Sequence, residues 1–125
     1  MASVAAAIAL VTFGSRLHRW EAPRPGHVLV LRLDVLAAAG TVDPDLRLDV
    51  DGARLLSCPR RDLVPGRVAH LLLTVWVPGS AAGGTVRVTA TVRVRPHPKA
   101  PVRLFRKTYS VDVCAQISRR AHSCW

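Results

Sequence analysis

The sequence predicts an all-β fold, an immunoglobulin-like antiparallel β-sandwich of two sheets. Apolar and polar residues alternate along several runs, which is typical of strands that bury one face. Valine is the commonest apolar residue in these runs, and the 125 residues include only three Trp, one Tyr and two Phe. Turns rich in Gly, Pro and Asp separate the runs at the spacing expected of a sandwich.

The first half of the chain contains two clear strands. Residues 28–36 alternate directly after Pro25-Gly26, and residues 46–50 alternate after a turn of small residues, Asp and Pro. Asp51-Gly52 follows, and this pair favours a tight turn because glycine takes positive φ without strain. We expect the turn to send residues 53–56 back along the same sheet.

The second half contains three more strands. Residues 68–77 alternate between Pro65-Gly66 and Pro78-Gly79, and residues 86–95 alternate almost without fault. Prolines 96, 98 and 101 then interrupt pairing, and the last strand is expected over residues 102–117. The side chains predicted to face inward are Leu29, Leu31, Leu33, Val35, Leu46, Leu48, Val50, Leu71, Leu73, Val75, Val77, Val86, Val88, Ala90, Val92, Val94, Tyr109, Val111, Val113, Ala115 and Ile117.

The length fits a single domain that can bury a core without a metal or disulfide. We assign residues 1–20 to a signal peptide or N-terminal extension, 21–118 to the sandwich and 119–125 to a basic tail. Residues 2–13 are apolar but too short to span a bilayer, and Thr12 and Gly14 suit a signal-peptidase cut after Gly14. Cleavage there predicts a secreted protein. No Lys or Arg precedes this stretch, whereas a signal peptide normally begins with a positively charged region. The alternative is that the segment is not cleaved and forms an N-terminal strand or short helix.

The net charge of +10 comes from 16 Arg and two Lys against eight acidic residues. A gene rich in G and C produces the same bias, because the codons of Arg, Ala, Gly, Pro and Val are G/C-rich. The cations do not gather in one cluster with aromatic residues. They alternate with apolar residues along separate strands and are therefore expected on the outward faces; examples are Arg32, Arg47, Arg87, Arg93 and Arg95. We therefore expect no specific nucleic-acid site, although the charge favours anionic surfaces.

Three cysteines permit at most one intramolecular disulfide. Cys114 and Cys124 form the easiest closure because the loop between them is short, which leaves Cys58 as the odd thiol. Three reduced thiols are the alternative, with Cys114 at the end of a buried strand.

No pattern in the sequence indicates an enzyme. The five histidines are dispersed, and none stands at metal-ligand spacing from a Cys or carboxylate. Nucleophile-elbow and phosphate-loop motifs are absent. Asp34, Asp49 and Asp112 fall on outward parities, where solvation or pairing with Arg across strands is the usual fate. We predict no catalytic residue, metal or cofactor.

The order of several short motifs resembles the ML (lipid-recognition) domain family, which includes a sterol carrier and the group 2 mite allergens. These motifs are a strand after Pro25-Gly26, a strand ending in Asp51-Gly52, Cys58-Pro59, a strand from Gly66 to Val77-Pro78, and a terminal strand with Leu104-Phe105. The resemblance covers residues 22–117. It implies two sheets that splay apart and hold a lipid tail or sterol between them.

The chain departs from this family in its cysteines. Family members carry three disulfides, whereas the upstream partner of Cys58 is absent here and Arg106 stands where a cysteine follows Leu104-Phe105. Residues 1–20 match the family's first strand poorly. These departures indicate a lipid pocket that is smaller, remodelled or lost.

Two functions remain. The first is a secreted lipid or sterol carrier, in which inward side chains bind the ligand by desolvation alone. Its predicted ligand-binding residues are Leu31, Leu33, Leu71, Leu73, Val75, Val88, Val92 and Val111. A receptor protein and an anionic membrane surface are its expected partners, the membrane through Arg119, Arg120 and Trp125.

The second is an immunoglobulin-like protein–protein interaction module with a filled core. Exposed Trp76 and Tyr109, or a basic edge formed by Arg87, Arg93 and Arg95, would contact the partner, because aromatic residues and Arg predominate at binding hot spots. The sequence leaves open whether the two sheets interdigitate or stand apart around a ligand.

Overall fold

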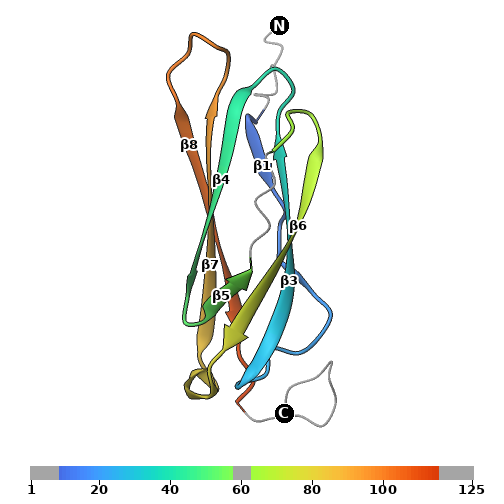
Figure 1. Cartoon of the computed structure of the whole chain (residues 1–125), viewed down its shortest axis with the longest axis vertical. Helices are drawn as coiled ribbons and strands as arrows, with labels where there is room; N and C mark the ends of the chain where they lie inside the picture. The colour runs from blue at the N-terminus through green and yellow to red at the C-terminus, as the bar shows by residue number, and fades with distance from the viewer. Residues whose placement is uncertain (1–8, 58–62, 116–125) are drawn as a thin grey trace, which may run out of the picture.

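Two antiparallel sheets pack face to face in the computed structural model, which describes residues 9–57 and 63–115 (Figure 1). This confirms the predicted all-β sandwich. The first sheet, called sheet A, has the order β1-β3-β6-β5, with β2 also paired to β3. Its strands are β1 (Val11–Phe13), β2 (His18–Arg19), β3 (His27–Ala37), β5 (Arg54–Ser57) and β6 (Val68–Val77). Sheet B has the order β4-β7-β8, with strands β4 (Val42–Asp51), β7 (Thr85–Arg95) and β8 (Arg103–Asp112).

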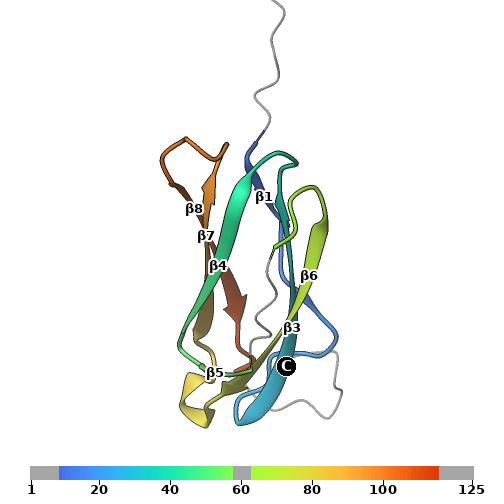
Figure 2. The same cartoon turned by 45° about the horizontal axis from the view of Figure 1, so that its top comes forward.

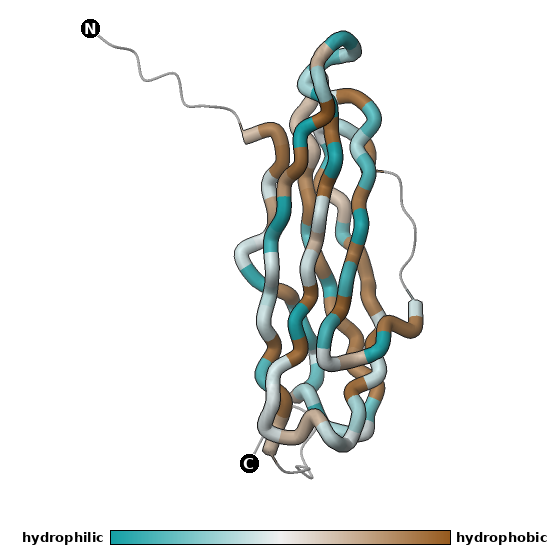
Figure 3. Tube along the Cα trace, turned by 90° about the vertical axis from the view of Figure 1, so that its left-hand side faces the viewer, coloured by the Kyte–Doolittle hydropathy of each residue, from teal (hydrophilic) through white to brown (hydrophobic). Residues whose placement is uncertain are grey.

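The alternation in the sequence sets the two faces of each sheet, as the hydropathy along the chain shows in Figure 3. β3 and β6 pair antiparallel over ten residues without a register shift, so each inward residue of β3 lies opposite an inward residue of β6. The inward residues predicted on these two strands and on β7 are all buried: Leu29, Leu31, Leu33, Val35, Leu71, Leu73, Val75, Val77, Val86, Val88, Ala90, Val92 and Val94. Those of β4, which are Leu46, Leu48 and Val50, pack against this core while half-buried.

The last strand is shorter than predicted. β8 ends at Asp112, and Ala115 is exposed. The N–H of Val113 still donates to the Gly84 carbonyl at 2.9 Å, in register with the pairing of β7 and β8. The backbone then leaves β7, and the N–H of Cys114 donates to the Pro23 carbonyl at 2.8 Å. Ile117, which was predicted to face inward, lies outside the described residues.

The Asp51-Gly52 turn forms, but the prediction that it returns the chain along the same sheet is wrong. β5 pairs with β6 in sheet A, so the turn carries the chain from one sheet to the other (Figure 2). Gly52 has φ +84°, and a Cβ here would lie 2.8 Å from the Thr85 carbonyl oxygen. The positive φ and the close approach to β7 both require glycine at this crossing.

The N-terminal region contributes to the sandwich before residue 21, where the domain was predicted to begin. β1 and β2 both pair with β3, and Val11 is buried in the core. Cleavage after Gly14 would therefore remove a strand from sheet A. Residues 1–8 and the predicted tail 119–125 lie outside the described residues.

Candidate interaction surface

The eight residues predicted to bind lipid lie together in one core cluster between the sheets. Seven of them have none of their surface exposed, and Val111 has 9%. A side chain beside an empty cavity larger than a water molecule would show exposed surface inside that cavity. The facing side chains therefore fill the space between the sheets, at the close packing usual for protein interiors.

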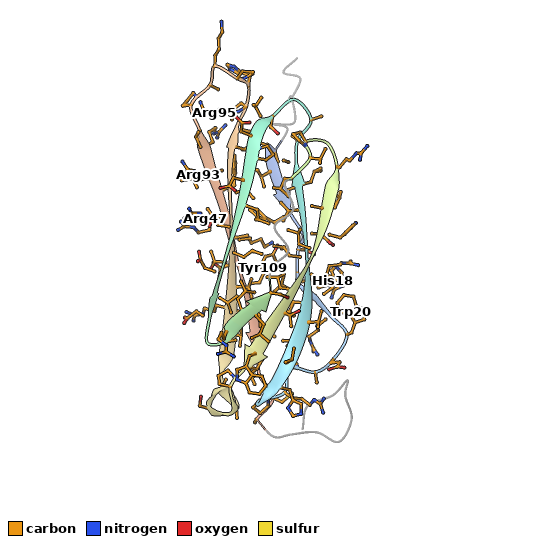
Figure 4. All side chains as sticks on the ribbon, in the orientation of Figure 1. His18, Trp20, Arg47, Arg93, Arg95 and Tyr109 are labelled. Atoms are coloured by element: carbon orange, nitrogen blue, oxygen red, sulfur yellow. The ribbon has the colours of Figure 1, made fainter. Side chains whose placement is uncertain are left out.

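The outward face of sheet A is unusually apolar, whereas a solvated sheet face normally carries polar side chains. Val28 and Val30 of β3 point outward beside Trp76, Thr74 and Leu72 of β6. Trp20 follows β2 and lines a small hollow with Glu21 and Val30; Figure 4 shows it on this outer side. The exposed apolar residues of this surface, which we call the sheet A face, are Trp20, Val28, Val30, Leu56, Val68, Leu72 and Trp76.

A charged cluster lies within the sheet A face and centres on Asp34, whose side chain is only 20% exposed. The Nδ1–H of His70 donates to Asp34 Oδ1 at 2.6 Å. His18 Nε2 lies 3.5 Å from Asp34 Oδ2. Arg32 Nη2 donates to Asp34 Oδ2 at 3.4 Å. Arg32 Nε lies 3.2 Å from Oδ1 but has no hydrogen-bond partner. Three side chains, from β2, β3 and β6, thus meet on one carboxylate.

The cluster changes the acidity of Asp34. Burial alone raises the pKa of this carboxyl group, but the hydrogen bond from His70 and the positive charges of Arg32, His70 and His18 outweigh burial. The pKa of Asp34 is therefore lowered from its ordinary 3.8, and the group is a carboxylate at neutral pH. Arg32 already matches the charge of Asp34, so the cluster presents one guanidinium and two imidazoles, and no unpaired carboxylate, to a partner.

The sequence did not predict this cluster, because its members are distant in the chain. The prediction for Asp34 was solvation or pairing with Arg, and the His residues were taken as dispersed. The signal that could have found the cluster is the register: Asp34 lies directly opposite His70, and Arg32 lies directly opposite His18. The sequence indicates which face of its strand each side chain takes, but not which strand lies beside it.

Tyr109 was predicted both to face inward and to serve as an exposed contact residue, and the second prediction is wrong. Its ring is buried between the sheets (Figure 4), and its hydroxyl donates to the Gly14 carbonyl at 2.6 Å. Burial and the nearby charge of Asp34 both raise the pKa of the Tyr109 hydroxyl. Trp76, in contrast, is partly exposed on the sheet A face as predicted.

Arg87, Arg93 and Arg95 do not form a basic edge. They lie on β7, which is the middle strand of sheet B, and Figure 4 shows Arg93 and Arg95 on the outer side of that sheet with Arg47. β7 is central because β4 and β8 pair with its two sides. Asp51 lies opposite Arg87 and Asp45 opposite Arg93, so this face mixes both charges and differs from the sheet A face.

Cys114 is disulfide-bonded, while its predicted partner Cys124 lies outside the described residues, as do Cys58 and Pro59. In the described part of the chain, no three His, Cys, Asp or Glu side chains form a group able to hold a metal ion. This includes the Asp34 cluster, where the two imidazoles approach different oxygens of the carboxylate and the Arg32 guanidinium lies beside them. No helix among the described residues is long and apolar enough to cross a membrane.

Neither a protein-family model nor a curated protein matches the chain. The resemblance to the ML family therefore stays a prediction.

Proposed function

We propose that this chain is a protein–protein interaction module with a filled core, and that it binds its partner through the sheet A face. The observation that carries this proposal is the asymmetry of the sandwich. One outer face exposes seven valine, leucine and tryptophan side chains around a charged cluster, while the other carries mainly Arg, Asp and Thr, with Leu104 as an isolated exposed apolar residue. Contiguous exposed apolar residues on a folded domain mark interaction sites.

The chemistry of the sheet A face specifies the kind of partner. Trp76, Trp20 and Leu72 offer the large apolar contacts that dominate binding energy when they are desolvated. Arg32 and the two imidazoles lie among them, and Arg54 of β5 lies opposite Trp76. Asp34, already paired, is the only carboxylate of the cluster. The partner is therefore a protein whose docking surface is apolar at its centre and carries carboxylates.

A photo-crosslinking experiment tests this proposal. A photoreactive amino acid at position 72 reports on the sheet A face, and one at position 89, on the outward face of β7, is the matched control. In the cells that naturally make the protein, we expect one discrete protein adduct from position 72 and none from position 89. Equal adducts from both positions, or none from either, would overturn the proposal.

The captured protein then allows a direct binding measurement. Leu72→Asp places a charge in the apolar surface without touching the core, and we expect it to weaken binding by at least about tenfold, or about 1.4 kcal/mol. Leu104→Asp makes the same substitution on the outer face of sheet B, where Leu104 is exposed and lies opposite Arg93, and it should leave the Kd unchanged. Both variants should melt close to the wild type, since both sites are at the surface.

The lipid carrier is the competing function. A ligand between the sheets would have to displace side chains that now pack against each other, so binding would require the sheets to separate. Native mass spectrometry of protein purified from a lipid-containing host distinguishes the two. The interaction module predicts the bare mass; a retained lipid mass that organic solvent releases would favour the carrier.

A further inference from the structure

The free edge of β8 borders a groove that lies apart from the sheet A face and is lined in part by the core residues Leu31, Tyr109 and Val111. Leu31 and Val111 are two of the eight residues predicted to bind lipid. β8 is the last strand of sheet B and, among the described residues, pairs only with β7. A strand paired on one side presents a row of unpaired N–H and C=O groups on the other, which is a template for another strand. The groove has a volume of about 430 Å³, within the range of ligand clefts.

The two edges of sheet B differ in how they are protected. β4 carries Pro44, a register shift between Val42 and Asp45, and a positive φ of 53° at Asp43. Bulges and prolines of this kind prevent pairing with another chain. β8 has no proline between positions 103 and 112, and it pairs with β7 over ten residues without a shift. The regular edge is the one beside the groove.

The groove has walls that are already in place. β8 forms one wall from Lys107 to Asp112, and the other is formed by residues 15–17, which lead to β2, together with Arg19 of β2. The hydrogen bond from the Tyr109 hydroxyl to the Gly14 carbonyl ties the two walls together below, and the N–H of Gly14 donates to the Asp34 carbonyl at 2.7 Å. A site held in this way loses little conformational freedom when a ligand binds.

The charges of the groove select an acidic ligand. Arg16, Arg19 and Lys107 line it, and Lys107 Nζ lies 5.3 Å from the centre of the Tyr109 ring. Asp112 is the one carboxylate among the lining residues, and it accepts a hydrogen bond from Thr85 on the β7 side. The net charge of the lining is therefore positive.

A second copy of this chain does not suit the edge. β8 carries three cations, Arg103, Arg106 and Lys107, against one carboxylate, Asp112, so two β8 edges brought together would both be net positive. The whole chain carries a net charge of +10, which adds to the repulsion.

We propose that the free edge of β8 binds an extended acidic peptide segment of a partner protein, which adds to sheet B as a fourth strand. Backbone hydrogen bonds to β8 supply affinity, and carboxylates at alternate positions of the peptide face Lys107, Arg16 and Arg19. Alternate positions are required because successive side chains of a strand point to opposite faces. This site is distinct from the sheet A face and does not depend on it.

Fluorescence anisotropy with a synthetic peptide tests the proposal. The probe is a labelled peptide of about six residues, a typical strand length, in which Glu alternates with Val or Thr. We expect binding that weakens as salt is added, and NMR shifts confined to β8 and residues 15–19. A peptide with Lys in place of Glu should bind at least about tenfold more weakly. No binding at millimolar peptide, or shifts mapping elsewhere, would overturn the site.

Two further comparisons separate strand addition from simple charge attraction. Methylating alternate backbone nitrogens on the pairing side of the peptide removes its donors but keeps its charge, so this peptide should lose binding; unchanged binding would refute strand addition. Lys107→Glu and Arg16→Glu, on opposite walls, should each weaken binding by about tenfold. Arg93→Glu makes the same charge change on the outer face of β7 and should have little effect. Leu72→Asp, which tests the sheet A face, should not change the affinity for the peptide.

Discussion

Replacing Leu73 by Ala tests whether the two sheets meet in a filled core. Leu73 lies in the middle of β6 opposite Leu31 of β3, and neither has exposed surface. The substitution removes three carbon atoms, worth about 2.4 kcal/mol at about 0.8 kcal/mol each. The cavity left in a close-packed core adds to this, and buried Leu→Ala changes cost about 3–5 kcal/mol in total. We expect the free energy of unfolding to fall by about 3–4 kcal/mol.

Leu72→Ala is the matched control, because it makes the same change one residue away on the opposite face. Leu72 is 48% exposed, so we expect a loss of less than about 1 kcal/mol. Urea unfolding of lipid-free protein, followed by circular dichroism, measures both variants, and equal m-values would show that unfolding exposes the same surface. The Tm of Leu73→Ala should fall by more than about 10 °C.

The outcome that refutes a filled core is a small effect of Leu73→Ala. If the sheets stood apart around an empty lipid site, Leu73 would already border that space, and its truncation would create no new cavity. A loss below about 1 kcal/mol, or one equal to that of Leu72→Ala, would contradict the packing described here. It would also favour the carrier over the interaction module.

Three further changes test individual contacts. Tyr109→Phe keeps the ring but leaves the Gly14 carbonyl without its donor, so thermal melts should show a loss of about 1–2 kcal/mol; an unchanged Tm would contradict this. The lowered pKa of Asp34 stabilises the fold above its ordinary pKa of 3.8, and this contribution is lost as pH falls through the lower folded pKa. Urea unfolding from pH 7 to 2 should therefore show Asp34→Asn less stable than wild type by about 1–3 kcal/mol near neutral pH. The difference in the free energy of unfolding should shrink in acid, and a difference that does not change with pH would count against the cluster. Gly52→Ala adds a clash to the strain of positive φ, whereas Gly26→Ala adds only strain of about 1 kcal/mol. Gly52→Ala should therefore have the lower Tm of the two, and equal Tm values would exclude the clash.

Strand parity was the part of the fold that the sequence predicted best. β6 occupies residues 68–77, as expected from its glycine and proline boundaries, and its alternate residues divide between core and surface. The reason is local: side chains of a strand alternate between two faces whatever the strand pairs with. The two errors at strand ends, at β5 and after Asp112, arose where backbone groups bond to distant residues.

The candidate sites followed less directly. Trp76 was predicted to be exposed and is, whereas the Asp34 cluster and the groove beside β8 were missed. Both depend on segments separated by many residues, such as Gly14 and Tyr109. A pattern along one segment contains no information about which other segment will lie beside it.

The sequence by itself therefore determined that the chain forms sheets, where most strands lie, and which side chains face inward. These properties follow from alternation, turn residues and burial, which act over a few neighbouring residues. Only the tertiary structure decided that the sheets close on a filled core and that β7, not an edge strand, carries Arg87, Arg93 and Arg95. It also decided that the sheet A face combines exposed apolar side chains with the Asp34 cluster. Strand order and the approach of one sheet to another are set by packing across the whole chain, so they become visible only when the strands are placed together.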